Sequence, residues 1–387
     1  MAKNRSNEND KRPFVTIIIL SADDVRITFQ CLEALFKCTY YSPLEVLVVD
    51  NGSDPEQGRK LTKEILKYKG SRIKILRNEK NLGYARANNQ AALEASGELL
   101  VFLNNDVVVT SSWLPPLVSF MMKNRNNAAC QPKLRSFVER EYFDYAGGAG
   151  GFLDMFGYPF TRGRVFDCIE KDVGQYDKPT EITWASGSCM VVRTDLFLEE
   201  HGFDEYFFSY MEEIDLCLRL KRKGYSIYCL PETCVYHYGA YTSNKDLGRK
   251  IFLNHRNNLY FIFKHYSIWP NFPLILIRLL FDIGSILHYL VEYHLGFVVA
   301  VIRAHLSLVI ILPKLIREGV LTFKGRSLLV DDNIYKGSVV VSHFLLGRNN
   351  FDEVMGKGFR RQNYKRYVDV TYFREKTGEL IPLPTNA

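Results

Sequence analysis

The chain has 387 residues, which is too long for one small domain and suits two or three units or one large α/β domain with an appendage. Hydrophobic residues make up 47% of it, which excludes wholesale disorder and allows a sizeable core. The net charge of +7 is uneven, because residues 314–366 hold 11 Lys and Arg against 5 Asp and Glu. Such a basic segment suits an anionic membrane surface or nucleic acid, or is simply a solvated tail.

The cysteines and the first residues predict the compartment. None of the eight cysteines shows C-x-x-C spacing and several lie in apolar runs, so we expect buried free thiols instead of a zinc site or disulfides. Residues 1–13 are polar, so we expect a disordered tail there. They lack the apolar segment of a signal peptide, so we expect no such peptide. Together these features predict a cytoplasmic protein.

Strand and helix patterns alternate in the first part of the chain. Apolar, β-branched runs predict buried strands, and Ala-rich or amphipathic stretches predict helices. The strands are expected at residues 14–20, 44–50, 72–76 and 98–103, and the helices at residues 26–36 and 84–95. This order predicts an α/β fold with a parallel sheet covered on both faces, in which ligands bind beyond the carboxyl ends of the strands. The glycine-rich residues 145–163 lack a phosphate-loop signature and are expected to form a mobile loop near the site.

Two acidic residues follow predicted strands. Asp50, in the segment D-N-G-S, can accept a hydrogen bond from the ring N–H of uracil or thymine, or can end the strand in an ordinary turn. Asp106, in N-N-D, can hold a hard divalent cation that bridges the phosphates of a nucleotide sugar, although N-N-D is also a common turn. His237 completes this cation site if the fold brings it to Asp106.

A third group of acids begins a predicted helix over residues 210–222. Ser209 and Glu212 have the spacing of a capping box, which gives Glu212 a structural role. Asp215 is expected to pair with an arginine four residues later. Glu213 has neither role and shares a face with apolar residues. Its carboxylate either serves the helix dipole or takes a proton from an attacking hydroxyl group.

The order of eight segments resembles glycosyltransferase family 2, and in particular the bacterial rhamnosyltransferases of surface-polysaccharide synthesis. The segments, within residues 14–265, are VTIIIL, CLEALFKCTY, LEVLVVDNGS, NLGYARANNQA, GELLVFLNNDV, WASGSCMVVR, GFDEYFFSYMEEIDLCLRLKRKGY and VYHYG. The resemblance implies a GT-A fold with a mixed, mostly parallel sheet. It also implies a metal-dependent hexosyl or deoxyhexosyl transferase that inverts the anomeric carbon of a nucleotide-diphosphate sugar, with dTDP-rhamnose as a candidate donor.

The resemblance also implies a role for individual residues. It makes Glu213 the catalytic base, with Glu212 and Asp215 as alternates, and makes Asp106 and His237 the ligands of Mg or Mn. It assigns donor binding to Asp50, Asn81, Gly83, Asn88, Asn104, Asp106 and Gly187.

Three positions depart from the family pattern. Asn104 replaces the first acid of the DXD motif and is a weaker metal ligand. Glu213 stands where the family has Asp, so its carboxylate reaches one methylene further. Residues 21–24 replace the polar end of the first strand, which leaves the contacts to the nucleotide base there open.

Two other functions are weighed against sugar transfer. A nucleotidyltransferase on a similar sheet needs a glycine-rich, basic loop after the first strand, and ILSADDVR lacks one. A glycan-binding scaffold without activity does not need the acids at Asp106 and Glu213. We therefore expect an enzyme that acts on a glycan or lipid-linked glycan acceptor, with no nucleic-acid partner.

Four segments are expected: a tail at residues 1–13, the catalytic domain at 14–266, apolar or amphipathic helices at 267–318, and a basic tail at 319–387. Residues 274–312 are strongly apolar and predict two helices. The first carries a polar stripe at helical spacing, formed by Arg278, Asp282, Ser285, Tyr289 and Glu292.

The second of these helices carries Arg303 and His305 near its middle, so neither is a clean membrane span. We expect both helices to lie in the membrane interface on the inner face of the cell membrane, beside a lipid-linked acceptor. The basic residues that would meet anionic headgroups are Lys314, Arg317, Lys324 and Arg326. The alternative is that the helices pack on the catalytic domain or form a homo-oligomer interface.

Overall fold

A computed structural model describes residues 12–22, 25–68, 70, 72–239, 247–322, 326–328, 331–356 and, as backbone only, 364–366. Most of the expected N-terminal tail, Lys324 and most of residues 357–387 lie outside the described residues. So does the second half of residues 21–24.

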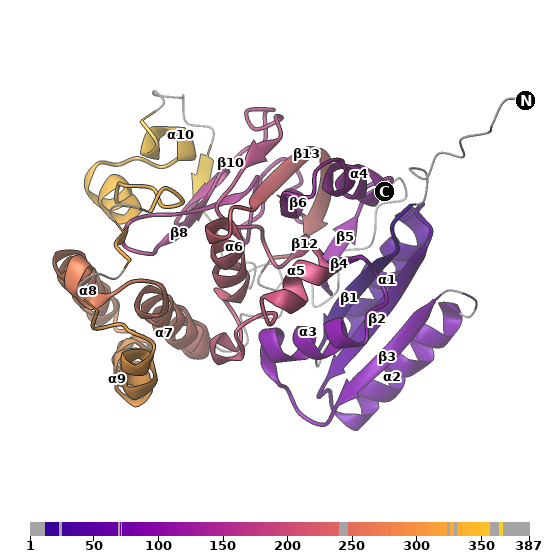
Figure 1. The fold of residues 1–387 in the computed structure, drawn as a ribbon, viewed down its shortest axis with the longest axis horizontal. Helices are drawn as coiled ribbons and strands as arrows, with labels where there is room; N and C mark the ends of the chain where they lie inside the picture. The colour runs from indigo at the N-terminus through magenta and orange to yellow at the C-terminus, as the bar shows by residue number, and fades with distance from the viewer. Residues whose placement is uncertain are drawn as a thin grey trace, which may run out of the picture.

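The main sheet of the described chain has nine strands in the order β11-β13-β6-β12-β4-β1-β2-β3, with β5 paired to β13 (Figure 1). Strands β4, β1, β2 and β3 are parallel to one another, whereas β12 runs antiparallel to both β4 and β6. The bounds are β1 Val15–Ser21, β2 Leu44–Asn51, β3 Ile73–Asn78, β4 Leu99–Asn104, β5 Val107–Val109, β6 Asn127–Ser136, β11 Thr180–Glu181, β12 Cys189–Arg193 and β13 Ser226–His237.

Helices cover this sheet, as the α/β prediction requires. They are α1 Val25–Cys38, α2 Pro55–Ile65, α3 Gly83–Leu93, α4 Leu114–Lys123, α5 Thr194–Glu199 and α6 Glu212–Arg222. All four predicted strands and both predicted helices of the first part are confirmed, with ends that differ by at most two residues. The β-branched runs succeed as predictors because both faces of β1, β2 and β4 are buried.

A second sheet of five strands has the order β14-β10-β9-β8-β7. Its strands are β7 Gly151–Leu153, β8 Pro159–Thr161, β9 Arg164–Val165, β10 Cys168–Glu170 and β14 Tyr364–Arg366. The prediction of a loop over residues 145–163 is therefore wrong. The glycines there serve close packing, since a Cβ at Gly151 would overlap the indole ring of Trp184.

The described residues between 326 and 356 pack on the catalytic domain, which differs from the tail expected from the charge of this segment. Asp331 forms an ion pair of 2.8 Å with Arg222 of α6, and the N–H of Val339 donates to Asp154 Oδ2 at 2.9 Å. Phe351, which begins the short helix α10 Phe351–Val354, is buried in the same core. Apolar residues scattered among the charges thus complete the fold.

Three long helices lie at one side of the molecule (Figure 1). They are α7 Leu247–His265, α8 Ile268–Val291 and α9 Leu295–Arg317. The N–H of Ile268 donates to the carbonyl of Val320 at 2.7 Å, so the hairpin of α8 and α9 returns to the point where it began. The prediction of two apolar helices is confirmed, and both are long and apolar enough to cross a membrane by length and composition.

Candidate active site

Asp106 and His237 meet at the end of the sheet. The turn after β4 carries Asp106, and β5, which follows it, pairs with the end of β13 that carries His237. His237 Nε2 lies 3.0 Å from Asp106 Oδ1, and both side chains are buried. Neither atom makes a well-directed hydrogen bond among the described residues. A buried carboxylate and imidazole that make no directed hydrogen bond to each other are ordinary ligands of a divalent cation.

Asp144 is a residue that sequence reasoning missed. Its Oδ2 lies 3.0 Å from His237 Nδ1, on the side of the ring opposite Asp106. Burial lowers the pKa of His237, but the two carboxylates outweigh burial and raise that pKa well above its usual range. A carboxylate behind a histidine fixes the ring and leaves the other nitrogen for a metal. Asp144 belongs to none of the sequence motifs, and only the fold brings it to His237.

Asp50 forms the turn that one interpretation of its segment predicts. It is fully buried, and its Oδ1 accepts a hydrogen bond of 3.0 Å from the N–H of Ser53, which is the predicted turn. Its Oδ2 accepts no hydrogen bond from the described residues and lies 3.7 Å from Arg77 Nε. One carboxylate oxygen therefore builds the turn, and the other lies buried beside Arg77 without a hydrogen bond among the described residues.

The residues expected to bind the donor around α3 also build the start of that helix. Asn81 Oδ1 accepts from the N–H of Gly83 at 2.9 Å, and Asn88 Nδ2 donates to the carbonyl of Tyr84 at 2.9 Å. Gly83 has φ +83°, and a Cβ there would lie 2.6 Å from the carbonyl oxygen of Phe208. That carbonyl accepts from the N–H of Tyr84 at 2.6 Å, so α3 is joined to the segment before α6.

Gly187 and Tyr84 connect the parts of the site. Tyr84 Oη donates to the carbonyl of Gly187 at 2.8 Å. A Cβ at Gly187 would lie 2.9 Å from Tyr84 Oη. The neighbouring Ser188 accepts a hydrogen bond of 3.4 Å from Asn104 Nδ2. Burial, followed by the carboxylates of Glu212 and Glu213, raises the pKa of Tyr84 well above its usual range. The end of β4, Gly187 and the start of α6 are thus connected through Ser188 and Tyr84.

The capping box predicted at the start of α6 is wrong. The helix begins at Glu212, its N-cap is Met211 in the left-handed region, and no side chain caps it. Glu212 and Glu213 each have an Oε2 that accepts no hydrogen bond from the described residues. Burial, reinforced by Glu213, raises the pKa of Glu212 well above its usual range, and burial raises the pKa of Glu213 to about 7. Glu212 is buried, whereas Glu213 is partly exposed as a residue, with its Oε2 just below the surface, so Glu213 lies nearer to a substrate than Glu212.

Asp215 is held in a network of cations. It contacts Arg219 and Lys264 at 2.9 and 2.7 Å, and it accepts a hydrogen bond of 2.8 Å from His265 Nε2. Burial opposes its charge, but His265 and the two cations lower its pKa well below the usual range. The predicted pair with Arg219 is confirmed. A fully buried, paired carboxylate of this kind is a poor proton acceptor, which weakens the case for Asp215 as an alternate base.

The backbone before α6 is strained and is held by α7. Phe208, Tyr210 and Met211 have φ of 64°, 72° and 76°, which side chains other than glycine rarely adopt. Asn257 of α7 is fully buried, and its Nδ2 donates to the carbonyls of Phe207, Ser209 and Tyr210 at 2.9, 2.8 and 2.7 Å. Sequence reasoning missed Asn257, since no local pattern marks a residue that acts on a distant loop.

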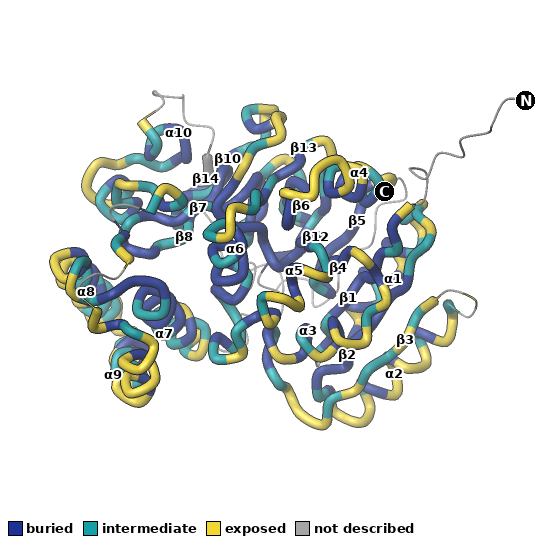
Figure 2. Tube along the Cα trace, viewed as in Figure 1, coloured by how far each residue is buried: buried dark blue, intermediate teal, exposed yellow. Residues whose placement is uncertain are grey.

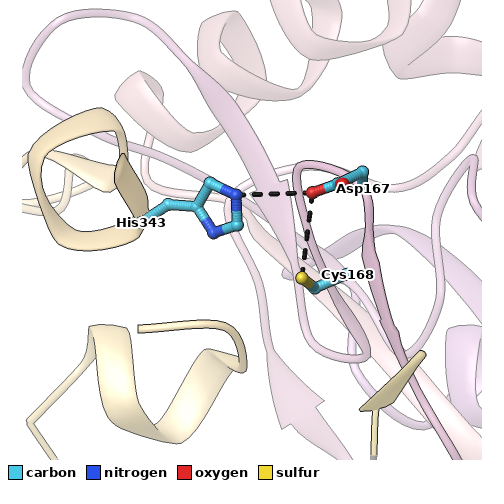
Figure 3. Close-up of side chains that lie close together, drawn as sticks. All are labelled: Asp167, Cys168 and His343. Carbon is cyan, nitrogen blue, oxygen red and sulfur yellow. Dashed lines mark hydrogen bonds and ion pairs between the residues drawn. The ribbon is translucent and has the colours of Figure 1, made fainter. Parts of the chain in front are cut away.

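Three polar side chains meet where the C-terminal segment contacts the smaller sheet. His343 Nε2 is 3.3 Å from Asp167 Oδ1, and the thiol of Cys168 donates to the same oxygen at 3.7 Å (Figure 3). His343 belongs to a π-helical turn, Val341–Leu345, and its ring stacks on Phe166 at 5.1 Å. These contacts fix the C-terminal segment to the turn between β9 and β10. The expectation of free thiols is also confirmed, with Cys234 half-buried and the other seven buried.

The comparison of sequences identifies the family. The family described as Glycosyl transferase family 2 matches residues 17–197. The chain carries a glycosyltransferase family 2 domain. It is 30% identical over 239 residues to the O-antigen biosynthesis protein RfbC of Myxococcus xanthus, covering 60% of this chain and 18% of the relative. It is 26% identical over 252 residues to the N-acetylglucosaminyl-diphospho-decaprenol L-rhamnosyltransferase of Mycobacterium tuberculosis, covering 60% and 78%.

Further comparisons define the branch and the fold. Rhamnosyltransferase WbbL of Escherichia coli is 29% identical over 161 residues, covering 42% of this chain and 60% of WbbL. The family 2 domain is therefore similar to the rhamnosyltransferase-like branch, and the chain spans less than two thirds of RfbC and of WbbL. The crystal structure of GalNAc-T7 with UDP, GalNAc and Mn2+ is similar at a TM-score of 0.51 and 16% identity, covering 66% of this chain and 48% of GalNAc-T7. The fold is the GT-A fold that the sequence predicts.

Proposed function

We propose that this chain is an inverting, metal-dependent glycosyltransferase of cell-surface polysaccharide synthesis. It transfers a sugar from a nucleotide-diphosphate sugar to a glycan or lipid-linked glycan acceptor. One observation carries the proposal: the Asp106–His237 pair is buried at the end of the sheet, and its facing atoms make no directed hydrogen bond among the described residues. Glu213, whose carboxylate acts on Tyr84, is the acid proposed as the base. dTDP-rhamnose is the donor to test first, because two relatives are named as rhamnosyltransferases.

The proposed reaction is a direct displacement at the anomeric carbon. Glu213 takes the proton of an acceptor hydroxyl while the hydroxyl oxygen forms a bond to that carbon. The bond from the carbon to the diphosphate breaks, and the diphosphate leaves with the electron pair. Attack opposite the leaving group inverts the anomeric configuration. The free oxygen of Asp50 accepts from the nucleotide base, and the Tyr84–Gly187 contact shapes the floor of the space for the sugar.

Asp106 and His237 are the residues that would hold Mg or Mn. Their carboxylate and imidazole are ordinary ligands for either cation, and Asp144 keeps the imidazole oriented. A cation held there neutralises the charge that grows on the departing diphosphate. The similar GalNAc-T7 structure contains Mn2+, which supports a divalent metal without deciding between the two.

The proposed setting is the cytoplasmic face of the cell membrane. Free thiols at all eight cysteines support a reducing compartment. The experiment that tests the function is a panel of nucleotide sugars, each scored for metal-dependent thermal stabilisation and for slow hydrolysis without acceptor. Stabilisation and hydrolysis of at least one donor support the proposal. Binding of a glycan without turnover of any nucleotide sugar contradicts it and favours a scaffold.

Activity should fall as the pH drops through about 7. The base must be unprotonated to act, and burial raises the pKa of Glu213 to about 7, so the active fraction rises with pH through that value and then levels. Rates of transfer at saturating donor, measured across this range, check the prediction. The Glu213→Gln variant should lose this dependence at its residual rate. An acidic limb that persists in Glu213→Gln assigns the titration to another group.

Asn257→Leu should lower kcat by about 100-fold, the usual effect of misplacing a catalytic group by about 1 Å, and should change KM for the donor little. The substitution keeps the side-chain size but removes the three hydrogen bonds that hold the strained segment before Glu213.

Asn271→Leu is the matched control for this prediction. Asn271 is also fully buried and also bonds backbone groups, at Ser267 and Arg326, away from α6. It should lower the melting temperature comparably and leave kcat unchanged. Equal losses of kcat in both variants would show that Asn257 is only a structural residue.

A further inference from the structure

Helices α8 and α9 expose apolar side chains almost exclusively. From Trp269 to the end of α8, the exposed residues are apolar except His288, and from Leu295 to Pro313 of α9 they are apolar except Arg303. Figure 2 shows both helices largely exposed on the sides away from α7. A surface helix of a globular protein has the opposite pattern, with charged residues outside and an apolar stripe inside.

The exposed apolar residues form one continuous stripe on each helix. On α8 they recur at spacings of three and four residues, at Phe272, Leu276, Leu280, Ile283, Leu287 and Leu290. On α9 the same spacing relates Leu295, Val299, Ile302, Leu306 and Val309. Leu280 and Leu306 are 57% and 60% exposed, so the stripes face away from the rest of the protein.

The opposite face of the hairpin is polar and buried. Arg278 and Asp282 form an ion pair with each other, and both are almost completely buried. His255 of α7 and His305 of α9 approach Asp282 at 3.0 and 3.1 Å. The polar stripe predicted on the first helix therefore faces the protein at these positions. Separating a buried ion pair is costly, so the network prevents the hairpin from rolling to hide its apolar stripes.

We propose that the outer face of α8 and α9 is a membrane-docking surface, on which both helices lie in the plane of a bilayer that contains anionic lipid. Charge complementarity supports lipid: Lys314, Arg317 and Arg326 are exposed at the end where the hairpin opens, and the one acid exposed beside them, Glu318, leaves this end with a net positive charge. A partner protein would need hydrogen-bonding groups on such a face, at about one bond per 100–200 Å². Lipid chains need none.

The hairpin lies flat instead of crossing the bilayer, because its inner face is occupied by the catalytic domain near the middle of α8. The guanidinium of Arg278 stacks on the ring of Tyr158 at 4.4 Å, and Phe281 packs on Phe156 at 5.2 Å. A spanning helix would have to carry these polar neighbours into the hydrocarbon. Amphipathic helices in the interface bury only their apolar side.

Docking would bring the active site to the membrane through α7. His255 of α7 bonds Asp282 under the docking surface, and Asn257, two residues later, holds the segment before Glu213. The surface is thus one helix away from the proposed base, which suits an acceptor anchored in lipid. That consequence rests on the proposed function, whereas docking itself does not.

Flotation with liposomes and the fluorescence of Trp269 test the proposal on the full chain. Trp113 and Trp184 are buried and Trp269 is 46% exposed, so a change in emission on adding vesicles reports Trp269. We expect the chain to float with vesicles of anionic lipid and to bind zwitterionic vesicles more weakly. Rising salt should release part of it, because the basic residues contribute through a screened attraction. Quenchers attached near the headgroup should quench Trp269 more than quenchers at the chain ends.

The double variant Leu280→Asp with Leu306→Asp should lose flotation by at least tenfold and keep its melting temperature, because both side chains point outward. Leu93→Asp, at an apolar residue 74% exposed on α3, is the matched control and should float normally. Donor hydrolysis in all three proteins reports the proposed function separately, so a chain that floats but turns over no donor refutes only the function. A full chain that stays in solution as a stable dimer, which the double variant dissociates, overturns docking and makes this face an oligomer interface. Equal or stronger quenching from the chain ends overturns the flat orientation.

Discussion

Glu213→Gln should lower the rate of sugar transfer by about 10²–10⁴-fold, the usual contribution of a positioned general base. Glutamine has nearly the same shape and accepts no proton, so the fold and donor binding should survive. Glu213 combines three features that a base needs: an Oε2 without a partner among the described residues, partial exposure, and a pKa that burial raises to about 7. Single-turnover transfer at saturating donor measures the loss, and a thermal shift with donor and metal checks binding.

Glu212→Gln is the matched control, because Glu212 is the neighbouring residue of the same helix turn and is more deeply buried. Burial and the carboxylate of Glu213 raise its pKa well above the usual range, which disfavours the charged form that a base needs, so replacement by an amide should change little. We expect its transfer rate to stay within about threefold of the parent, less than 1 kcal/mol of barrier. If Glu212→Gln is the inactive variant and Glu213→Gln is nearly normal, the base is Glu212.

Asp106→Ala should abolish metal-dependent transfer, with a loss of about 10³-fold or more. A cation at a leaving group contributes several kcal/mol to transition-state stabilisation, and each 1.36 kcal/mol is a factor of ten in rate. The same variant should lose the metal-dependent part of the thermal stabilisation by donor. Rates with Mg, Mn and excess chelator measure the effect.

Two weaker variants give this prediction a graded control. His237→Ala removes one ligand and should reduce, without abolishing, the response to metal. Asp144→Asn leaves both ligands in place and removes only the charge behind the imidazole, 3.0 Å from Nδ1, so metal affinity should fall about 10–100-fold. Full activity of Asp106→Ala in excess chelator would rule out the metal assignment.

The sequence predicts the sheet well and the site only in part. Runs such as residues 14–20 and 44–50 are buried on both faces, and a local apolar pattern is enough to reveal them. The contact of Asp106 with His237 depends on the pairing of β5 with β13, which no local pattern contains. The resemblance to the family implied that Asp106 and His237 share a metal site, but it did not indicate that Asp144 contacts His237.

The start of α6 shows why a correct spacing can still mislead. Ser209 and Glu212 have the spacing of a capping box, but three residues between Phe208 and Met211 adopt positive φ, and the helix begins later than predicted. Asn257 bonds the carbonyls of Phe207, Ser209 and Tyr210 in this segment, and its role becomes visible only when α7 is packed on the domain. The prediction of a basic tail at residues 319–387 fails for a similar reason, because it considered the charges alone. The apolar residues of this segment are buried in the core, namely Leu328, Ile334, Val339 and Phe351.

The path of the chain shows that the hairpin of α8 and α9 is inserted into the catalytic domain and is not a C-terminal extension of it. The N–H of Ser267 bonds the carbonyl of Arg326 at 3.2 Å, and the side chain of Asn271 spans the same junction, so the chain re-enters the core where it left. Residues translated after the hairpin then supply Asp331 to Arg222 and Val339 to Asp154. During synthesis the apolar helices therefore emerge while the catalytic core is still incomplete. A truncation at Tyr266 removes part of that core, and a soluble form requires excision of α8 and α9 with a short linker that joins Ser267 to Arg326.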